Sequence, residues 1–461
     1  MLLLPLLIQH VYRLYGSLRT SWFNVPLDHA APWSNESLAL RYLLDTSTHR
    51  PNGPLVVYTG NEAAIETFSS REAAGFLYVI ASRFGGAVAF IEERYYGESV
   101  PVQQPRFGFL SSVQVIADYA LVIASLRRSL NTTRVLAVGG SYGGMLAAWL
   151  RKQHPDLVSA ALASSAPLLG FASTLRRQHR DSGFYDVTEC AYASCRNALG
   201  SAFRALWAAP KASRTRIDAD FGLCANSSVT SNAALEGLIG FLQQQLSDIA
   251  FINYPYVNGA VPANPAEFAC SRVPVSSGGW LPLRDALAWH YQQAGQCLSL
   301  QPAIAAYTPG FLPGAWTFQR CTDLVMAFSV PANSTLFLSC GEFAPNCADQ
   351  GMQGLRAFCR SLFGVSVPDS AMLQDFWGSD WSASAGGSRI IFSNGNLDPW
   401  SYGGVPDSVA GGDDGPHVLH IASGAHHIDL RAADPHDPPD VTAARATEAD
   451  ILGRWLGVEL N

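Results

Sequence analysis

The segment 134–150, with the sequence RVLAVGGSYGGMLAAWL, predicts a buried strand, a tight turn and then a helix. Its first residues form a short apolar run, typical of a strand covered on both faces, and its last residues favour a helix. Between them lies Gly-x-Ser-x-Gly with Ser141 at the apex, where Gly139 and Gly143 avoid the clashes that a Cβ would cause. We interpret the segment as a nucleophile elbow, in which the Tyr142 N–H points at a developing oxyanion. The alternative is a glycine-rich turn with an incidental serine.

Composition restricts the function classes. The chain has 461 residues, of which 48% are hydrophobic and 15% charged, so a large core is expected. The net charge is −7 and no basic stripe occurs, which argues against a nucleic-acid partner. No apolar run is long enough to span a bilayer. The apolar start at residues 1–8 is short and lacks a basic n-region, so a signal peptide and an incidental start both stay open.

Cysteines and sequons point to an oxidising compartment. All nine cysteines fall between residues 190 and 359, and CxxC spacing, which would favour zinc, does not occur. Their clustering predicts disulfides, with one cysteine left over. Four glycosylation sequons agree with a lysosomal, vesicular or secreted protein: Asn35, Asn131, Asn226 and Asn333.

Alternating strand and helix patterns predict a mostly parallel sheet covered on both faces. The expected strands are 37–44, which should be antiparallel and partly exposed, 54–59, 87–91, 134–138, 158–165, 389–394 and 417–422. Helices are expected at 113–130 and 443–456. Between about residues 170 and 370 the pattern breaks into turns and helical pieces that contain every cysteine. The pattern therefore predicts one α/β-hydrolase core that is interrupted by a helical, disulfide-bonded cap.

A catalytic constellation follows from chain order. A serine nucleophile needs a base, and the base needs an orienting carboxylate. In α/β-hydrolases these follow successive strands in the order Ser, Asp, His, and here Ser141, Asp398 and His426 do so. Spacing alone does not choose between His426 and His427 as the base. A metal cluster is the rival hypothesis for the histidine pair, which we consider weak because no further His or Cys group supports it; its other members would be Asp429, Asp434, His436, Asp437 and Asp440.

Motifs along the whole chain resemble the serine peptidase family that contains lysosomal Pro-X carboxypeptidase, dipeptidyl peptidase II and thymus-specific serine protease. The matching pieces are Leu27-Asp28-His29, the segments 58–62, 93–99 and 139–145, Tyr254-Pro255-Tyr256, Cys321-Thr322-Asp323, and the segments 392–400 and 425–431. The resemblance implies a triad of Ser141, Asp398 and His426, the first of the two histidines, with no metal or cofactor. It implies a core of residues 1–170 and 371–461, with a cap at 171–370. A homodimer is compatible with the sequence.

Within the family, Asn396 and the segments 262–265 and 376–378 resemble dipeptidyl peptidase II, whereas Ala147-Ala148-Trp149 resembles the carboxypeptidase. The first of these resemblances implies release of N-terminal X-Pro or X-Ala dipeptides from peptides with a free amino terminus. The oxyanion hole is then expected at the N–H groups of Tyr142 and Ala63. A carboxylate must meet the substrate ammonium, and the substrate-binding candidates are Asn61, Glu62, Asp323 and Trp400. Ala63, Glu93 and Asp323 depart from the family pattern. A Pro-X carboxypeptidase is the nearest alternative, and an esterase-type or non-catalytic hydrolase is the second.

Overall fold

The computed structural model describes most of the chain: residues 18–101, 107–171, 173–174, 182–274, 276, 278–292, 296–300, 310–311, 314–326, 328–339 and 350–458. The apolar start at residues 1–8, Cys340 and Cys347 lie outside the described residues. None of the described helices is long and apolar enough to cross a membrane.

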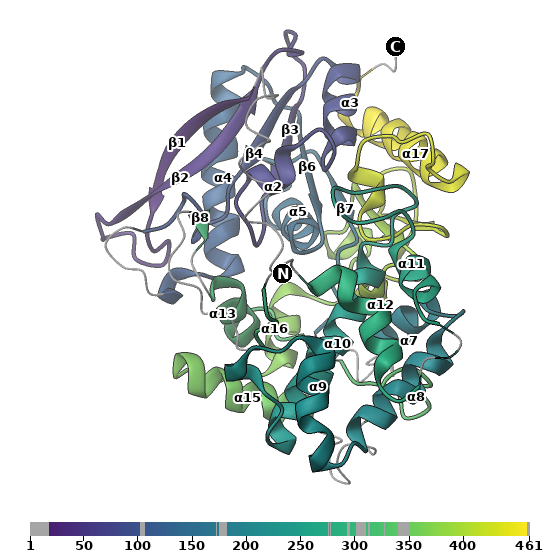
Figure 1. Cartoon of the computed structure of the whole chain (residues 1–461). Helices are drawn as coiled ribbons and strands as arrows, with labels where there is room; N and C mark the ends of the chain where they lie inside the picture. Colours follow the sequence, from purple (N-terminus) through teal and green to yellow (C-terminus); the bar gives the residue numbers. More distant parts are fainter. Residues whose placement is uncertain are drawn as a thin grey trace.

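An eight-stranded sheet forms the centre of the molecule (Figure 1). Its order is β1-β2-β4-β3-β6-β7-β9-β10, and all pairings from β4 to β10 are parallel. The strands are β1 (Arg19–Pro26), β2 (Ser37–Asp45), β3 (Leu55–Thr59), β4 (Ala87–Ile91), β6 (Val135–Gly140), β7 (Ala160–Ser164), β9 (Ile390–Gly395) and β10 (His417–Ile421). The predicted mostly parallel sheet is therefore confirmed, as is the antiparallel pairing of β2.

Helices cover both faces of this sheet. On one face, α4 (Ser112–Ser129) and α5 (Tyr142–Gln153) pack on alternate strand residues, and on the other face α3 (Gly75–Phe84) and α17 (Pro439–Leu456) do the same. Strands β3, β4, β6 and β7 are buried along their whole length, which explains their continuous apolar runs. This arrangement is the α/β-hydrolase fold predicted from the sequence.

Strand β1 was not predicted. It pairs with β2 along its full length, from Arg19 opposite Leu44 to Pro26 opposite Ser37. Only Val25 of this edge strand is buried, so its sequence has no continuous apolar run. An edge strand with one open side gives a weak sequence signal, because packing rather than local propensity holds it.

A second hydrophobic cluster lies in the helices below the sheet in Figure 1. It is built by α7 (Gly183–Ala191), α8 (Arg196–Trp207), α9 (Arg214–Phe221), α10 (Asn232–Phe251), α11 (Pro265–Ser271) and α12 (Leu281–Tyr291). The stripe of leucines and isoleucines along α10 faces this cluster, so these helices have a core of their own. The further short elements are α2 (Glu66–Ser69), β5 (Tyr96–Gly97), β8 (Gly310–Phe311), α13 (Ala315–Thr322), α15 (Gln350–Phe363) and α16 (Ser370–Trp377).

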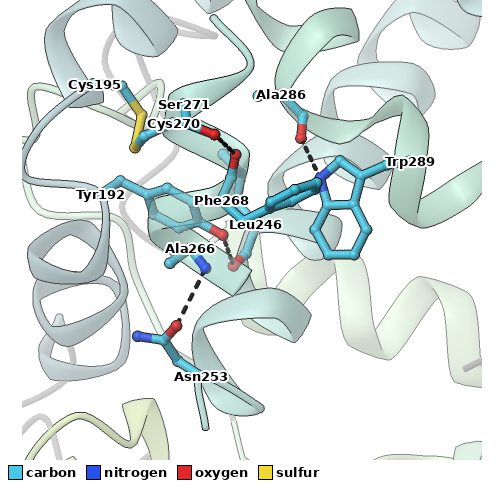
Figure 2. Close-up of a disulfide and its surroundings, with 10 residues drawn as sticks. All are labelled: Tyr192, Cys195, Leu246, Asn253, Ala266, Phe268, Cys270, Ser271, Ala286 and Trp289. Atoms are coloured by element: carbon cyan, nitrogen blue, oxygen red, sulfur yellow. Dashed lines mark hydrogen bonds between the residues drawn. A yellow bond between two sulfur atoms is a disulfide. The ribbon is translucent and has the colours of Figure 1, made fainter. Parts of the chain in front are cut away.

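Three disulfides cross-link this part of the chain, as the cysteine clustering predicted. They join Cys195 to Cys270, Cys224 to Cys297 and Cys321 to Cys359. Figure 2 shows the first of them, which ties the start of α8 to α11. Cys190 is exposed and free.

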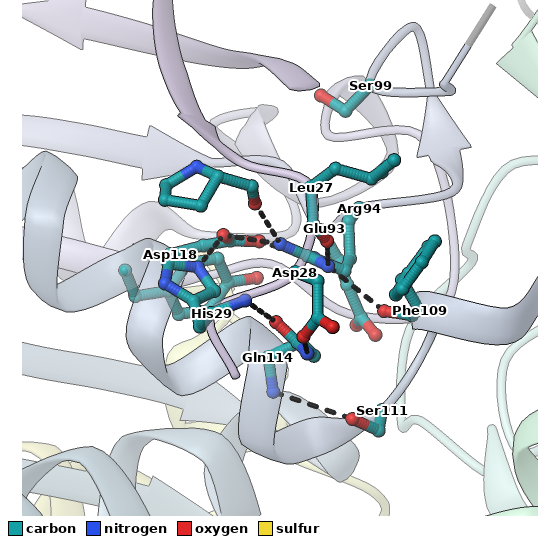
Figure 3. Close-up of polar contacts among 12 residues, drawn as sticks. Leu27, Asp28, His29, Glu93, Arg94, Ser99, Phe109, Ser111, Gln114 and Asp118 are labelled. Carbon is teal, nitrogen blue, oxygen red and sulfur yellow. Dashed lines mark hydrogen bonds and ion pairs between the residues drawn. The ribbon is translucent and has the colours of Figure 1, made fainter. Parts of the chain in front are cut away.

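A buried ion-pair network fixes the chain before β2 to the core (Figure 3). The Arg94 guanidinium is fully buried and donates to both Asp118 carboxylate oxygens at 2.7 Å. It also donates to the carbonyls of Pro26, Leu27 and Phe109. His29 contacts the same Asp118 carboxylate at 2.7 Å. The motifs around Arg94 and His29 thus have a structural role, since an unpaired guanidinium would be costly at this depth.

Candidate active site

The elbow has the geometry that its sequence predicts. Ser141 lies between β6 and α5 with φ 59° and ψ −128°, a strained conformation for a residue with a side chain. A Cβ on Gly139 would lie 2.2 Å from the Gly143 carbonyl oxygen, and one on Gly143 would lie 2.6 Å from that of Thr59. Both glycines are therefore required by close backbone approach. The first turn of α5 has no side-chain cap, so the Tyr142 N–H at its start is available to an anion.

Asp398 and His426 form a buried pair. The His426 Nδ1 atom lies 2.7 Å from Asp398 Oδ2, and both side chains are fully buried. The other Asp398 oxygen accepts the Trp400 N–H at 3.0 Å, which fixes the carboxylate. His426 Nε2 has no hydrogen-bond partner among the described residues, and its ring packs on Phe251 with centroids 4.3 Å apart. The imidazole is thus oriented through Nδ1, while Nε2 is left without a described hydrogen-bond partner.

The loop after β10 contains His426, His427 and Asp429 and is here called the histidine loop. It contacts the elbow through residues at the end of β7. The Ser164 carbonyl accepts the Ser141 N–H at 2.9 Å, and the Ser164 hydroxyl donates to Asp429 Oδ1 at 2.6 Å. Ser165, held at φ 48°, accepts the His427 N–H on its hydroxyl at 2.8 Å. These contacts fix the position of the loop relative to the turn that contains Ser141.

His427 differs from its neighbour in environment. Its ring packs against Gly140, where an added Cβ would meet it at 2.9 Å. Burial, followed by the nearby charges of His426 and Arg431, lowers the pKa of His427 well below its usual range. His427 is therefore neutral, and no carboxylate in the described part of the chain contacts its ring as Asp398 contacts that of His426.

The loop after β3 brings Asn61 and Glu62 to the elbow. Asn61 is buried and its amide lies 3.4 Å from the Gly140 carbonyl, while its Oδ1 has no partner among the described residues. Glu62 Oε2 is buried and also lacks such a partner. Burial raises the pKa of Glu62, and hydrogen bonding and the charge of His426 oppose this rise. The Ala63 N–H donates to the Asn61 carbonyl at 2.7 Å, so it is engaged within its own loop.

Asp323 has a partner within the protein. Its carboxylate accepts both the N–H and the hydroxyl of Ser112 at the start of α4. Beside it, the Tyr142 hydroxyl lies 3.1 Å from both Ser112 Oγ and Gln319 Nε2 and donates to Glu93 at 3.3 Å. Burial raises the pKa of Glu93 well above its usual range, so this carboxyl is neutral. The cluster anchors the Tyr142 side chain and with it the residue that follows Ser141.

Trp400 lies in a group of aromatic side chains at the contact between the core and α7. Phe184 stacks on Phe328 with centroids 4.3 Å apart, and Trp400 packs edge-on against both. Tyr402 completes the group from the turn that follows Asp398. The half-buried Trp400 therefore offers an aromatic face close to the pair of Asp398 and His426.

Sequence reasoning missed Gln319 of α13, whose side-chain nitrogen donates to the Glu93 carboxyl at 2.8 Å and lies 3.1 Å from the Tyr142 hydroxyl. A lone glutamine in a helix has no distinctive spacing, so its position four residues before Asp323 was the one available signal.

Among the described residues no group of three or more His, Cys, Asp or Glu side chains is arranged to hold a metal ion. His436, a member of the rival metal cluster, contacts Asp434 at 2.8 Å on the surface.

Comparison with known proteins decides the family. Residues 25–448 match the family model described as serine carboxypeptidase S28. The chain belongs to this family. Lysosomal Pro-X carboxypeptidase from Mus musculus is 31% identical, covering 94% of this chain and 88% of its own. Prolyl carboxy peptidase like protein 5 from Caenorhabditis elegans is 30% identical, covering 94% of this chain and 89% of its own. Thymus-specific serine protease from Homo sapiens is 26% identical, covering 95% of this chain and 87% of its own.

Membership of the S28 family makes this protein a serine-type peptidase of the α/β-hydrolase fold. The resemblance inferred from short motifs is thereby confirmed at the level of the family.

Proposed function

We propose that this S28 peptidase is an exopeptidase that cleaves peptides after proline near a chain end, with Ser141 as nucleophile, His426 as base and Asp398 as its orienting carboxylate. Two observations carry the proposal: the buried 2.7 Å contact between His426 Nδ1 and Asp398, and an elbow whose serine has positive φ. An imidazole oriented at Nδ1 and open at Nε2 is what a serine nucleophile requires.

The mechanism follows from these positions. The Ser141 hydroxyl adds to the scissile carbonyl while His426 Nε2 takes its proton. The carbonyl oxygen becomes an oxyanion, for which the Tyr142 N–H at the start of α5 is the first donor. His426 then gives the proton to the leaving amine, an acyl-enzyme remains, and water releases it by the same steps. Asp398 holds the tautomer and stabilises the imidazolium.

A second oxyanion donor is proposed from the loop after β3. The Ala63 N–H fits that role only when it leaves the Asn61 carbonyl, to which it donates in the described conformation. Substrate binding at the carbonyl would supply the competing acceptor. The rigid donor is therefore Tyr142, because the contacts of its side chain with Glu93 and Gln319 fix its place.

For the substrate terminus, we propose the carboxypeptidase reaction, in which the residue after proline is released. Relatives with more than 90% coverage of this chain are named Pro-X carboxypeptidases, which supports this choice. Asp323, one of two carboxylates expected to bind a substrate ammonium, is instead engaged by Ser112. Trp400 supplies an apolar face on which a proline ring can pack.

The dipeptidyl peptidase II activity favoured by the sequence is the second candidate. Glu62 supports it, because a buried carboxyl with an unpartnered oxygen near His426 could meet an ammonium. Asn396, the residue that suggested this activity, is exposed.

The cellular setting is also a proposal. The Pro-X carboxypeptidase relatives are named lysosomal, and the three disulfides suit an oxidising route, so we propose a lysosomal or secreted protein. The sequon residues Asn35, Asn131, Asn226 and Asn333 are all exposed, as glycan acceptors must be. Residues 171–370 are proposed as the cap that limits entry to chain ends.

The test compares three substrates at equal concentration: an N-acylated peptide ending in Pro-Phe acid, a free-amine X-Pro amide, and the N-acylated form of that amide. We expect cleavage of the first, and we expect Ser141→Ala to abolish it without changing the thermal unfolding midpoint. Cleavage of the free-amine amide alone would establish the dipeptidyl peptidase activity instead. Full turnover by a folded Ser141→Ala protein would remove the nucleophile assignment.

A further inference from the structure

The backbone of His426 is held by the end of α10 and by the residues that follow this helix. Its N–H donates to the Phe251 carbonyl at 3.2 Å, and its carbonyl accepts the Tyr254 hydroxyl at 3.0 Å. The Phe251 ring also packs on the imidazole, with centroids 4.3 Å apart. A segment about 172 residues earlier in the sequence therefore contacts both backbone polar groups of the histidine and its ring.

Tyr254 is itself fixed by several neighbours. Its side chain is buried, and its ring stacks on Tyr256 with centroids 5.7 Å apart. The Arg431 guanidinium lies over the same ring, 4.4 Å from its centroid, and the Tyr254 carbonyl accepts the Asn264 N–H at 2.8 Å. Burial raises the pKa of Tyr254 to about 12, so the hydroxyl keeps the proton that it donates to His426. Its hydroxyl is therefore a donor with a set position.

The segment from Phe251 to Tyr254 belongs to the helices of the second hydrophobic cluster. The apolar face of α10 lies in that cluster, and the Asn253 side chain accepts the Ala266 N–H at 3.2 Å (Figure 2). Ala266 is on α11, which the disulfide between Cys195 and Cys270 ties to α8. The backbone of His426 is thus anchored to the proposed cap.

The ring and the backbone of His426 are positioned by different parts of the protein. Asp398, which follows β9, orients the imidazole through Nδ1 at 2.7 Å. A hydrogen bond to one ring nitrogen does not fix the loop that contains the residue. Nε2 must meet the Ser141 hydroxyl, and a misplacement of about 1 Å can slow an enzyme reaction about 10²-fold. Efficient proton transfer therefore also needs contacts that fix the backbone of the histidine.

We propose that Tyr254 and Phe251 are positioning residues that hold His426 in line with Ser141. Docking of the helices of the second hydrophobic cluster on the core is then required to activate the nucleophile. This inference rests on the roles of Ser141 and His426 proposed above. Tyr254 and Phe251 act through His426 and take no part in proton transfer themselves.

The experiment compares Tyr254→Phe with the matched control Tyr192→Phe in the full-length protein. The Tyr192 hydroxyl donates to the Leu246 carbonyl of α10 at 2.8 Å, within the second hydrophobic cluster (Figure 2). Each variant therefore loses one buried bond from a phenol to a backbone carbonyl, but only one of these bonds is made to His426. Both variants should lower the thermal unfolding midpoint by similar amounts.

The probe is diisopropyl fluorophosphate, which is too small to need the peptide-binding subsites. The Ser141 oxygen forms a bond to phosphorus, fluoride leaves, and His426 takes the hydroxyl proton, so the inactivation rate measures the base and the nucleophile alone. We expect Tyr254→Phe to lower this rate constant about 10-fold and Tyr192→Phe to leave it unchanged. With a peptide substrate, Tyr254→Phe should lower kcat and leave KM nearly unchanged.

Two variants at Phe251 test the ring contact. Phe251→Ala should also slow the inactivation, and Phe251→Leu should restore most of the rate, because leucine keeps an apolar side chain against the imidazole. A wild-type rate for Phe251→Ala would remove Phe251 from the assignment.

His426→Ala separates this inference from the function on which it rests. If His426→Ala reacts slowly but Tyr254→Phe reacts as fast as Tyr192→Phe, the positioning role is wrong and His426 stays the base. A rise in KM without a fall in kcat for Tyr254→Phe would also overturn the positioning role. If His426→Ala reacts at the wild-type rate, the proposed base is wrong and the positioning role falls with it.

Discussion

Replacing Glu448 with glutamine should make the stability of this peptidase less sensitive to rising pH. Glu448 is on α17, fully buried, and faces Asp429 of the histidine loop and Ser393 of β9. Burial and then the Asp429 charge raise the pKa of Glu448 well above its usual range, and burial also raises that of Asp429. The fold therefore favours the protonated form of Glu448.

The sign and size follow from proton linkage. A glutamate in the unfolded chain ionises near pH 4.5. The stability that protonated Glu448 gives the fold is therefore fully present below that pH, and it is lost as the pH rises towards the folded pKa. The loss is at most about 1.4 kcal/mol per pH unit, or about 4 kcal/mol between pH 4.5 and 7.5. For 461 residues the unfolding entropy is roughly 1 kcal/mol per K, so the wild-type midpoint should fall by up to about 4 °C from this group.

The assay is thermal unfolding of the wild type, Glu448→Gln and the control Glu236→Gln at half-unit steps from pH 4.5 to 7.5. Glu236 is an exposed glutamate of α10. The Glu448→Gln curve should decline less steeply than the other two, and the control should follow the wild type. Equal slopes for all three proteins would refute the assignment of a protonated, buried Glu448.

Three further predictions concern the site. His426→Ala should reduce kcat at least 10³-fold, whereas His427→Ala should keep measurable turnover, because His426 contacts Asp398 and no described carboxylate contacts the His427 ring. An inactive His427→Ala beside an active His426→Ala would reverse the assignment. Gly140→Ala should lower kcat with little change in KM, since its Cβ would lie 2.9 Å from the His427 ring, and wild-type kinetics would show that the loop yields. Replacing Cys321 and Cys359 by serine should cost roughly 3–4 kcal/mol of stability by the loop-entropy estimate and raise KM, measured by thermal unfolding and kinetics; a stable variant with unchanged KM would contradict this.

The sequence predicted the parts of the fold whose signals are local. The buried strands β3, β4 and β6 each carry a continuous apolar run because helices cover both of their faces. Strand β1 carries no such run, since most of it is exposed at the edge of the sheet, and it was missed. The pairing of the cysteines could not be read from spacing, because the partners are up to 75 residues apart and only tertiary packing brings them together.

In the candidate site, Ser141, Asp398 and His426 follow β6, β9 and β10, and the parallel sheet brings the ends of these strands to one edge. The contacts of the other candidate residues depend on partners that are distant in sequence. Asp323 is engaged by Ser112, a contact across 211 residues that no local pattern reveals.

The register of the sheet explains how the site and the buried carboxyls are coupled. Gly140, the residue before Ser141, pairs with Ser164 on β7, and Ser164 pairs with Ser393 on β9. Ser164 also donates to Asp429, and Ser393 faces Glu448, so one row across three strands connects the elbow to the histidine loop and to α17. Because the three strands are held together by backbone pairing, we expect the loop to respond when a proton is lost from this row. Because that loop contains His426, ionisation of the buried carboxyls should disturb the pair of Asp398 and His426 before it unfolds the core.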